Sequence, residues 1–260
     1  MMGGGLVAPK PTNTLGMFGG RMAKTADHNA LAKAEDLASR GAPREQIWNE
    51  TGWFQGPDQK WRFEIDDSKS WLADWGFGKA QKAGNVMQHK DMFDAYPDLR
   101  EVPMQGTMSL DSAYNSGTDA MSVGMHKKNA ALHEFQHAIQ KREGFDAGGN
   151  VFSASASHPR VSEIGDQIGA LEARASAATS IDEARAIDSQ IRQLMAQQKQ
   201  AKENLGYGSY QSLPGEVEAR NVEARMNMSA EERRATPPWL TQDIADADQI
   251  VNLFSNGSKR

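Results

Sequence analysis

The chain has 260 residues, with 34 acidic and 29 basic side chains and a net charge of −5. Its 38% of hydrophobic residues together with 24 glycines match the roughly 45–50% apolar content of globular proteins, which excludes wholesale disorder and collagen-like structure. The negative net charge argues against a nucleic-acid coat, since phosphate binding needs clustered Lys and Arg. Cysteine is absent, so disulfides, cysteine nucleophiles and cysteine-ligated metal sites are excluded.

The N-terminal segment, residues 1–24, is rich in glycine and proline and is expected to form a flexible arm. It lacks the charged start and the long apolar stretch of a signal peptide. No stretch of the chain approaches the ~18 consecutive apolar residues of a membrane span. We therefore expect a protein that has no membrane span and is not secreted through a signal peptide.

Residues 25–98 predict helices followed by a Trp-rich hairpin. Apolar residues at helical spacing predict a helix over 25–40, and a short second helix follows Pro43 and ends at Gly52. A Gly-Pro-Asp turn then separates two strand-like stretches, with the tryptophans expected in the core. The alternation places apolar and charged side chains on opposite faces of the hairpin: Trp61, Phe63 and Ile65 on one, Arg62, Glu64 and Asp66 on the other.

The next part of the chain predicts strands and then a long helix. Short apolar runs between turn residues over 99–125 predict two or three strands. A helix is predicted over 127–143, because apolar residues recur three and four positions apart and Gly144 can end it.

Helical patterns also dominate the last third of the sequence. Apolar steps of three and four over 160–206 predict an inserted helical hairpin with a solvated outer face. A further helix is predicted after Pro214, and 229–260 predicts an extended tail with a short helix and a last strand. We group 99–228 as one domain that contains the hairpin as an insertion.

The sequence His133-Glu134-Phe135-Gln136-His137 is an H-E-x-x-H motif within the predicted helix. The spacing of four residues places His133 and His137 on one helix face, so both imidazoles can reach one Zn²⁺. Glu134 lies beside that face and can accept a proton from a water molecule whose pKa the zinc lowers. The motif therefore predicts zinc-dependent hydrolysis with Glu134 as the general base.

A catalytic zinc site needs a third protein ligand, which in a chain without cysteine must be His, Asp or Glu. His158 follows the motif but lies in a loop beside Pro159. Glu216 lies in the predicted helix after Pro214 and is the better candidate. Glu218 competes with it, but residues two apart on a helix lie on nearly opposite faces, so both cannot bind one ion.

HEFQH followed by a helix reading E-x-x-A-R is similar to the gluzincin metallopeptidases, in which the first Glu of an E-x-x-A-D motif binds the zinc. This resemblance implies Glu216 as the third ligand. The sequence departs from the gluzincins at Arg220, where those proteins have an aspartate that supports a ligand histidine. The spacing between His137 and Glu216 is also longer than in compact gluzincins.

Most of the chain also resembles the metallopeptidase-like domains in large polyvalent proteins of phages and related mobile elements. The resemblance rests on several segments taken together: TADHNALAKAEDLASRGA, KWRFEIDD, DAYPDLREVPM, LHEFQHAIQKREGF, PGEVEARNVEAR and PPWLTQD. It implies a phage or prophage protein, located in the virion or the host bacterial cytoplasm. Its implied partners are a peptide or protein substrate and other virion proteins.

Two further features have both a functional and a structural interpretation. Tyr210, shortly before the predicted ligand helix, could donate a hydrogen bond to an oxyanion or could simply pack under a loop. Residues 119–124, before the metal helix, could form an edge strand that aligns a substrate backbone or an ordinary core strand.

These patterns predict an α+β protein with a zincin-like fold, in which a small mixed or antiparallel sheet packs on the HExxH helix and a helical hairpin protrudes. The expected function is that of a zinc-dependent metallopeptidase. The alternative is a non-catalytic protein of the virion, or one ejected from it, that retains the zincin fold for binding. The glycine-rich arm and the exposed hairpin would suit that alternative.

Overall fold

The computed structural model describes residues 16–109, 111–125, 127–148 and 158–251. The chain divides into two compact units, the first made of Met1–Phe145 with Glu218–Asp243 and the second of Asp146–Val217 with Ile244–Arg260. Helices and small sheets are both present, so the mixed helix and strand content is confirmed. The zincin-like arrangement stays a prediction.

The first unit begins with a three-stranded antiparallel sheet and two helices. The sheet has the order β1-β3-β2, and the helices are α1 and α2; their bounds are β1 Met17–Gly19, α1 His28–Ser39, α2 Arg44–Thr51, β2 Trp53–Gln55 and β3 Trp61–Ile65. Apolar residues of α1 and α2 pack on the hairpin β2–β3 in one buried cluster: Leu31, Ala34, Leu37, Ile47, Trp53 and Trp61. The predicted helices, hairpin and tryptophan core are confirmed.

Strand β1 lies inside the segment predicted as a flexible arm. Met17 and Phe18 are buried. The backbone N–H of Phe18 donates to the side-chain oxygen of Gln136, and its carbonyl accepts from the Gln136 amide, both at 3.0 Å. Because a side chain completes the backbone pairing of this short strand, residues 17–19 are held in the core and do not form an arm. Residues 1–15 lie outside the described part of the chain.

A second, mixed sheet has the order β5-β7-β9-β8, in which β7 runs parallel to β9 and the other pairs are antiparallel. The elements of this region are β4 Trp71–Leu72, β5 Ala80–Lys82, α3 Ala83–Val86, β6 Met87–Gln88, α4 Lys90–Ala95, a 3-10 helix Pro97–Glu101, β7 Pro103–Thr107, β8 Ala113–Asn115 and β9 Ala120–Gly124. Three strands therefore follow residue 99, as predicted. Since β9 is paired on both sides, the edge-strand interpretation of 119–124 is wrong, and β5 and β8 form the two edges of this sheet.

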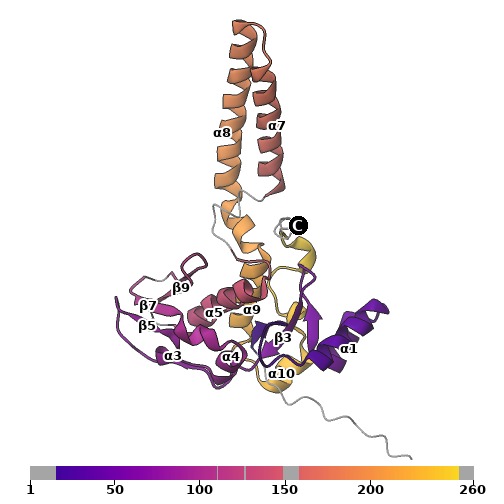
Figure 1. Cartoon of the computed structure of the whole chain (residues 1–260), viewed down its shortest axis with the longest axis vertical. Helices are drawn as coiled ribbons and strands as arrows, with labels where there is room; N and C mark the ends of the chain where they lie inside the picture. Colours follow the sequence, from indigo (N-terminus) through magenta and orange to yellow (C-terminus); the bar gives the residue numbers. More distant parts are fainter. Residues whose placement is uncertain (1–15, 110, 126, 149–157, 252–260) are drawn as a thin grey trace, which may run out of the picture. The chain divides into compact units, whose positions relative to one another are not determined.

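Helix α5, Lys128–Glu143, contacts β1 of the first sheet and β8 and β9 of the second (Figure 1). It ends at Gly144, whose φ of 65° lies in the left-handed region that glycine adopts without strain. Its apolar stripe is fully buried and consists of Ala131, Leu132, Phe135, Ala138 and Ile139. The helix predicted to carry the HExxH motif is thus the central element of the first unit.

The charged face of strand β3 is buried rather than exposed to solvent. Glu64 forms a bidentate ion pair with Arg225, at 2.7 and 3.1 Å, and both side chains are 0% exposed. Asp67, which follows β3, pairs with Arg233 through a single hydrogen bond of 2.9 Å from Nη2 to Oδ1. These arginines come from helices α9, Pro214–Arg225, and α10, Ala230–Ala235. Buried charges need partners, so the hairpin and residues 218–243 fold as parts of one unit.

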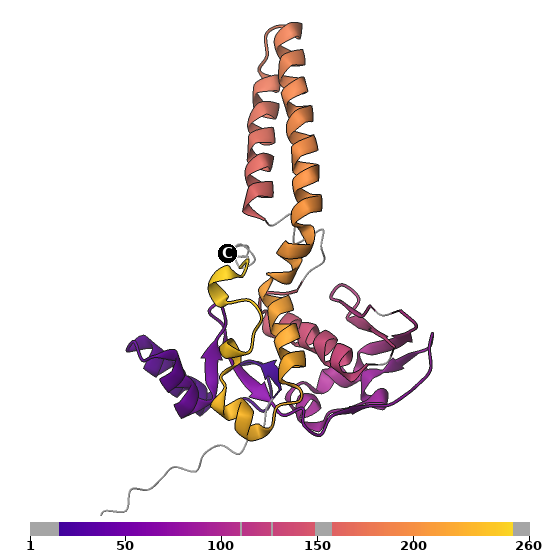
Figure 2. The same cartoon turned by 180° about the vertical axis from the view of Figure 1, so that it is seen from behind.

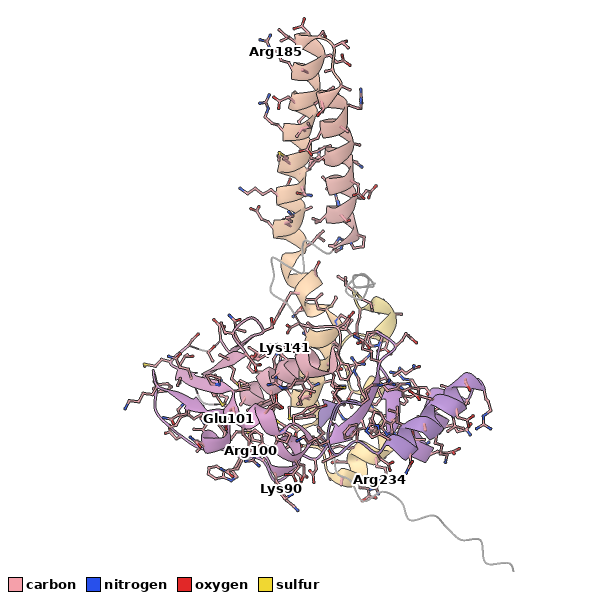
Figure 3. All side chains as sticks on the ribbon, in the orientation of Figure 1. Lys90, Arg100, Glu101, Lys141, Arg185 and Arg234 are labelled. Carbon is pink, nitrogen blue, oxygen red and sulfur yellow. The ribbon has the colours of Figure 1, made fainter. Side chains whose placement is uncertain are left out.

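The second unit is built on two antiparallel helices, α7 Pro159–Ser176 and α8 Ile181–Gln211, which lie side by side along α7 (Figure 2). The predicted helical hairpin is confirmed, and α8 extends beyond the predicted end at 206. Val161, Ile168 and Ile187 are buried between the helices. Most other side chains project outward, including Arg185 near the turn (Figure 3).

The tail contains 3-10 turns at Pro238–Leu240 and Asp246–Asp248 after helix α10. The predicted last strand is absent from the described part of the tail, which ends at Val251. In its place, the Ile250 N–H donates to the carbonyl of Ser212 at 2.8 Å. Among the described residues, no helix has the length and apolar character needed to cross a membrane.

The buried histidine at the start of α4 predicts a loss of stability in acid. Burial lowers the pKa of His89 to about 4, against a usual value of about 6.5. Between these pH values the unfolded chain binds more protons than the folded chain. The contribution of neutral His89 to the free energy of unfolding is therefore fully present above about pH 6.5 and decreases as the pH falls toward 4. We expect a loss of about 2–3 kcal/mol across this window in urea unfolding experiments.

The control for this prediction is His89→Asn. The Nδ1 atom of His89 accepts the N–H of Met92 at 3.2 Å as the N-cap of α4, and asparagine can replace that acceptor without titrating. The variant should be less sensitive to pH than the wild type between about pH 4 and 6.5. Equal losses in both proteins would contradict the assignment.

Candidate metal centre

The two histidines of the motif lie one turn apart on α5. The centroids of the His133 and His137 rings are 4.8 Å apart, and the ring planes are inclined by 76°. Glu134, between them in sequence, is 4% exposed. Helical periodicity therefore brings the two imidazoles together, as the sequence predicts, with the motif glutamate buried beside them.

His133 is oriented by a carboxylate from α9. Its Nδ1 atom lies 2.7 Å from Oε1 of Glu223, whose Oε2 accepts from the Asn129 amide at 2.8 Å. The hydrogen bond from His133, followed by that from Asn129, lowers the pKa of Glu223. An ionised carboxylate can only accept hydrogen bonds, so Nδ1 of the neutral ring carries the proton and Nε2 carries the lone pair that metal binding requires.

His137 is oriented by a side-chain amide from its own helix. Its Nδ1 atom lies 2.9 Å from Oε1 of Gln140, which is 0% exposed. The Nε2 group of Gln140 in turn donates to Oε1 of Glu218 at 3.0 Å. Both histidines therefore have a partner on Nδ1, an arrangement typical of metal-binding histidines.

The two competing glutamates of α9 have different surroundings. The carboxylate of Glu218 accepts hydrogen bonds from Arg62, from Gln136 at 2.7 Å and from Gln140. Glu216, in the first turn of α9, is 2% exposed. Among the described residues, His133, His137 and Glu216 each offer one ligand atom, and these atoms lie within 4.8 Å of one another. Two imidazoles and one carboxylate form a donor set that could hold a metal ion, and zinc as that ion stays a prediction.

Three further residues that the sequence analysis considered for the site are Tyr210, His158 and Arg220. Tyr210 is half-buried in the last turn of α8, and its role as an oxyanion donor stays a prediction. His158 is the N-cap of α7, where Nδ1 accepts from the N–H of Arg160 at 3.2 Å. Arg220 forms an ion pair with Asp243 at 2.7 Å, so it does not replace the aspartate of the gluzincins.

Glu223 and Gln140 are not among the site residues predicted from the sequence. Glu223 supports His133 in the way expected of the gluzincin aspartate, but it comes from one helical turn later than Arg220. The sequence feature that could have identified Glu223 is its position seven residues, or two helical turns, after Glu216, which places both on the same face of α9. Gln140 lies three residues after His137 on α5, a spacing that places the two side chains in contact.

Comparison with protein families identifies one segment of the chain. Residues 16–73 match the model of the large polyvalent protein associated domain 23. This segment contains β1, α1, α2 and the hairpin β2–β3, and it ends before the HExxH helix. The match confirms a polyvalent-protein domain and supports a phage or mobile-element context. No curated protein and no solved structure gives a significant match to this chain.

A close backbone approach fixes the first turn of α9. A Cβ atom on Gly215 would lie 2.0 Å from the backbone nitrogen of Gly148 and 2.3 Å from the carbonyl carbon of Ala147. Backbone atoms cannot yield as the end of a flexible side chain can. Glycine is therefore required immediately before Glu216.

Gly215→Ala should lower the free energy of unfolding by about 1–3 kcal/mol, the usual cost of overpacking. Gly208→Ala in α8 is the matched control, because a Cβ there meets nothing within 4 Å. That variant should be neutral or stabilised by up to about 1 kcal/mol. Thermal unfolding of both variants measures the difference, and equal stabilities would contradict the close approach.

Proposed function

We propose that this protein is a zinc-dependent metallopeptidase in which His133, His137 and Glu216 bind the metal. The observation that carries the proposal is the pair of supported histidines. Glu223 and Gln140 hold Nδ1 of the two rings, which leaves Nε2 as the metal-binding nitrogen of each. A pair of surface histidines with no metal function would not need a separate partner on Nδ1 of each ring.

Zinc, when bound, would polarise a peptide carbonyl and lower the pKa of water. Glu134 is the general base in this proposal, since it neighbours His133 on α5 and is almost fully buried. It would take the proton from the attacking water and deliver it to the leaving amine. Tyr210 is the proposed donor to the oxyanion that forms on the peptide carbonyl.

The proposed setting is a phage or prophage, with action in the virion or in the host bacterial cytoplasm. The match of residues 16–73 to a polyvalent-protein domain supports this setting. The proposed substrate is a peptide or protein, and other virion proteins are proposed partners.

A second candidate function is that of a non-catalytic structural protein in the virion or among its ejected proteins. The α7–α8 hairpin favours this candidate, because its outer faces carry exposed polar side chains along both helices (Figure 3). Such a hairpin suits the binding of a neighbouring protein. The two candidates differ in their dependence on zinc, which the structural role does not need.

Glu134→Gln tests the proposed chemistry. The purified protein, supplied with zinc, is incubated with random-sequence peptides, and new peptide termini are counted by mass spectrometry. We expect cleavage by the wild type and a loss of about 10²–10⁴-fold in Glu134→Gln, the usual contribution of a general base.

The variant should retain one zinc per chain, because Glu134 is not a proposed ligand. Glu101→Gln is the matched control, since Glu101 is exposed and pairs with Lys82. Cleavage that persists in Glu134→Gln would overturn the proposed mechanism. A wild-type chain that binds no zinc would overturn the proposed function and favour the structural role.

A further inference from the structure

A chain of part-buried hydrogen bonds connects the hairpin β2–β3 to the second motif histidine. Arg62 on β3 donates through Nε to Oε2 of Glu218. Oε1 of Glu218 accepts from Gln140, and Oε1 of Gln140 lies 2.9 Å from Nδ1 of His137. We refer to these four residues as the Arg62–His137 relay. All of them belong to the first unit.

The first member of the relay is firmly fixed. Arg62 is 2% exposed, and its two terminal nitrogens bind the carboxylate of Asp58 at 2.7 and 3.1 Å. Its guanidinium also lies 3.9 Å from the centroid of the Phe145 ring. Gly56 leaves room for it, because a Cβ there would be 2.4 Å from Nη1. Arg62 therefore presents Nε to Glu218 in one orientation.

The hydrogen bonds of the relay can have only one assignment of donors and acceptors. A guanidinium only donates hydrogen bonds and a carboxylate only accepts them. The NH₂ group of Gln140 must therefore face Glu218, which turns its oxygen toward His137. An oxygen at that position requires a proton on Nδ1 of the ring. Each bond in the chain thus fixes the next one, and the last fixes the tautomer of His137.

We propose that Arg62, Glu218 and Gln140 are positioning residues that hold His137 in the Nδ1–H tautomer, the form whose Nε2 can bind a metal. The polyvalent-protein segment 16–73 then supplies part of the support of the metal centre and is not a separate module. The consequence for metal affinity rests on the proposed function. The consequence for the tautomer does not, because it can be measured in the metal-free protein.

Glu218→Gln is the sharpest test because it keeps the shape of the side chain and reverses the relay. The charged Arg62 would retain the oxygen of the new amide, so the NH₂ group of that amide would take the place of Oε1 and face both Gln136 and Gln140. The Gln140 amide would then turn its own NH₂ group toward His137, which favours the Nε2–H tautomer. Two-bond ¹H–¹⁵N spectra of the imidazoles, recorded at about pH 8.5 where histidine is neutral, distinguish the tautomers.

We expect Nδ1–H for His137 in the wild type and Nε2–H, or a mixture, in Glu218→Gln. Zinc affinity, measured by competition with a chelator, should fall about 10–100-fold in Glu218→Gln and in Gln140→Leu, the usual effect of losing such support. Asp67→Asn is the matched control, because it also weakens a buried ion pair of this unit but its partner is Arg233. That variant should keep both the tautomer and the zinc affinity.

The outcomes separate this inference from the proposed function. An unchanged tautomer and unchanged zinc affinity in Glu218→Gln would overturn the relay and leave the metallopeptidase proposal intact. A tautomer change in a protein that binds no zinc would support the relay and overturn the metallopeptidase proposal. An Nε2–H tautomer in the wild type would overturn the relay directly.

Discussion

The hydrogen bonds to the carboxylate of Glu218, which is 11% exposed, are the interactions on which the first unit depends. This carboxylate accepts hydrogen bonds from Arg62 on β3 and from Gln136 and Gln140 on α5, so it joins three elements that are distant in sequence. A carboxylate removed from water is costly unless it is paired and hydrogen-bonded, and here three donors compensate the cost. Gln136 extends the same network to β1 through the backbone of Phe18. The support of His137 is therefore part of the core of this unit.

Elements with strong local patterns could be predicted from the sequence. Helix α5, the α7–α8 hairpin and the β2–β3 hairpin follow from periodicity, turn residues and helix ends. The motif histidines also needed only one helix, since their contact arises from the spacing of four residues. These features depend on interactions within about one or two turns or one hairpin, which a sequence reports directly.

Features that depend on distant partners could not be predicted. The charges on β3 resemble a solvated face, yet Glu64 finds Arg225 161 residues away and Arg62 finds Glu218 156 residues away. Alternation predicts two faces of a strand but does not say what covers them. For the same reason the support of His133 by Glu223 was missed, because it requires the register of α9 against α5. The strand β1 was hidden in a glycine-rich stretch because a glutamine side chain completes its pairing.

The family match and the proposed chemistry concern different parts of the chain. Residues 16–73 carry the polyvalent-protein domain, whereas the motif histidines lie on α5 beyond it. The match therefore supports a phage or mobile-element context, whereas the proposed chemistry rests on the residues around the motif histidines. The hydrogen bonds of Arg62 and Phe18 are what connect the two, because both residues belong to the matched segment and both reach the network around Glu218.

X-ray absorption at the zinc edge shows whether the motif histidines bind zinc. In the zinc-loaded protein we expect two imidazole nitrogens at about 2.0–2.1 Å together with oxygen ligands at about 2.0–2.2 Å. In His137→Ala one imidazole should disappear from the spectrum. A zinc ion surrounded by oxygen alone, or a chain that takes up no zinc, would contradict the account.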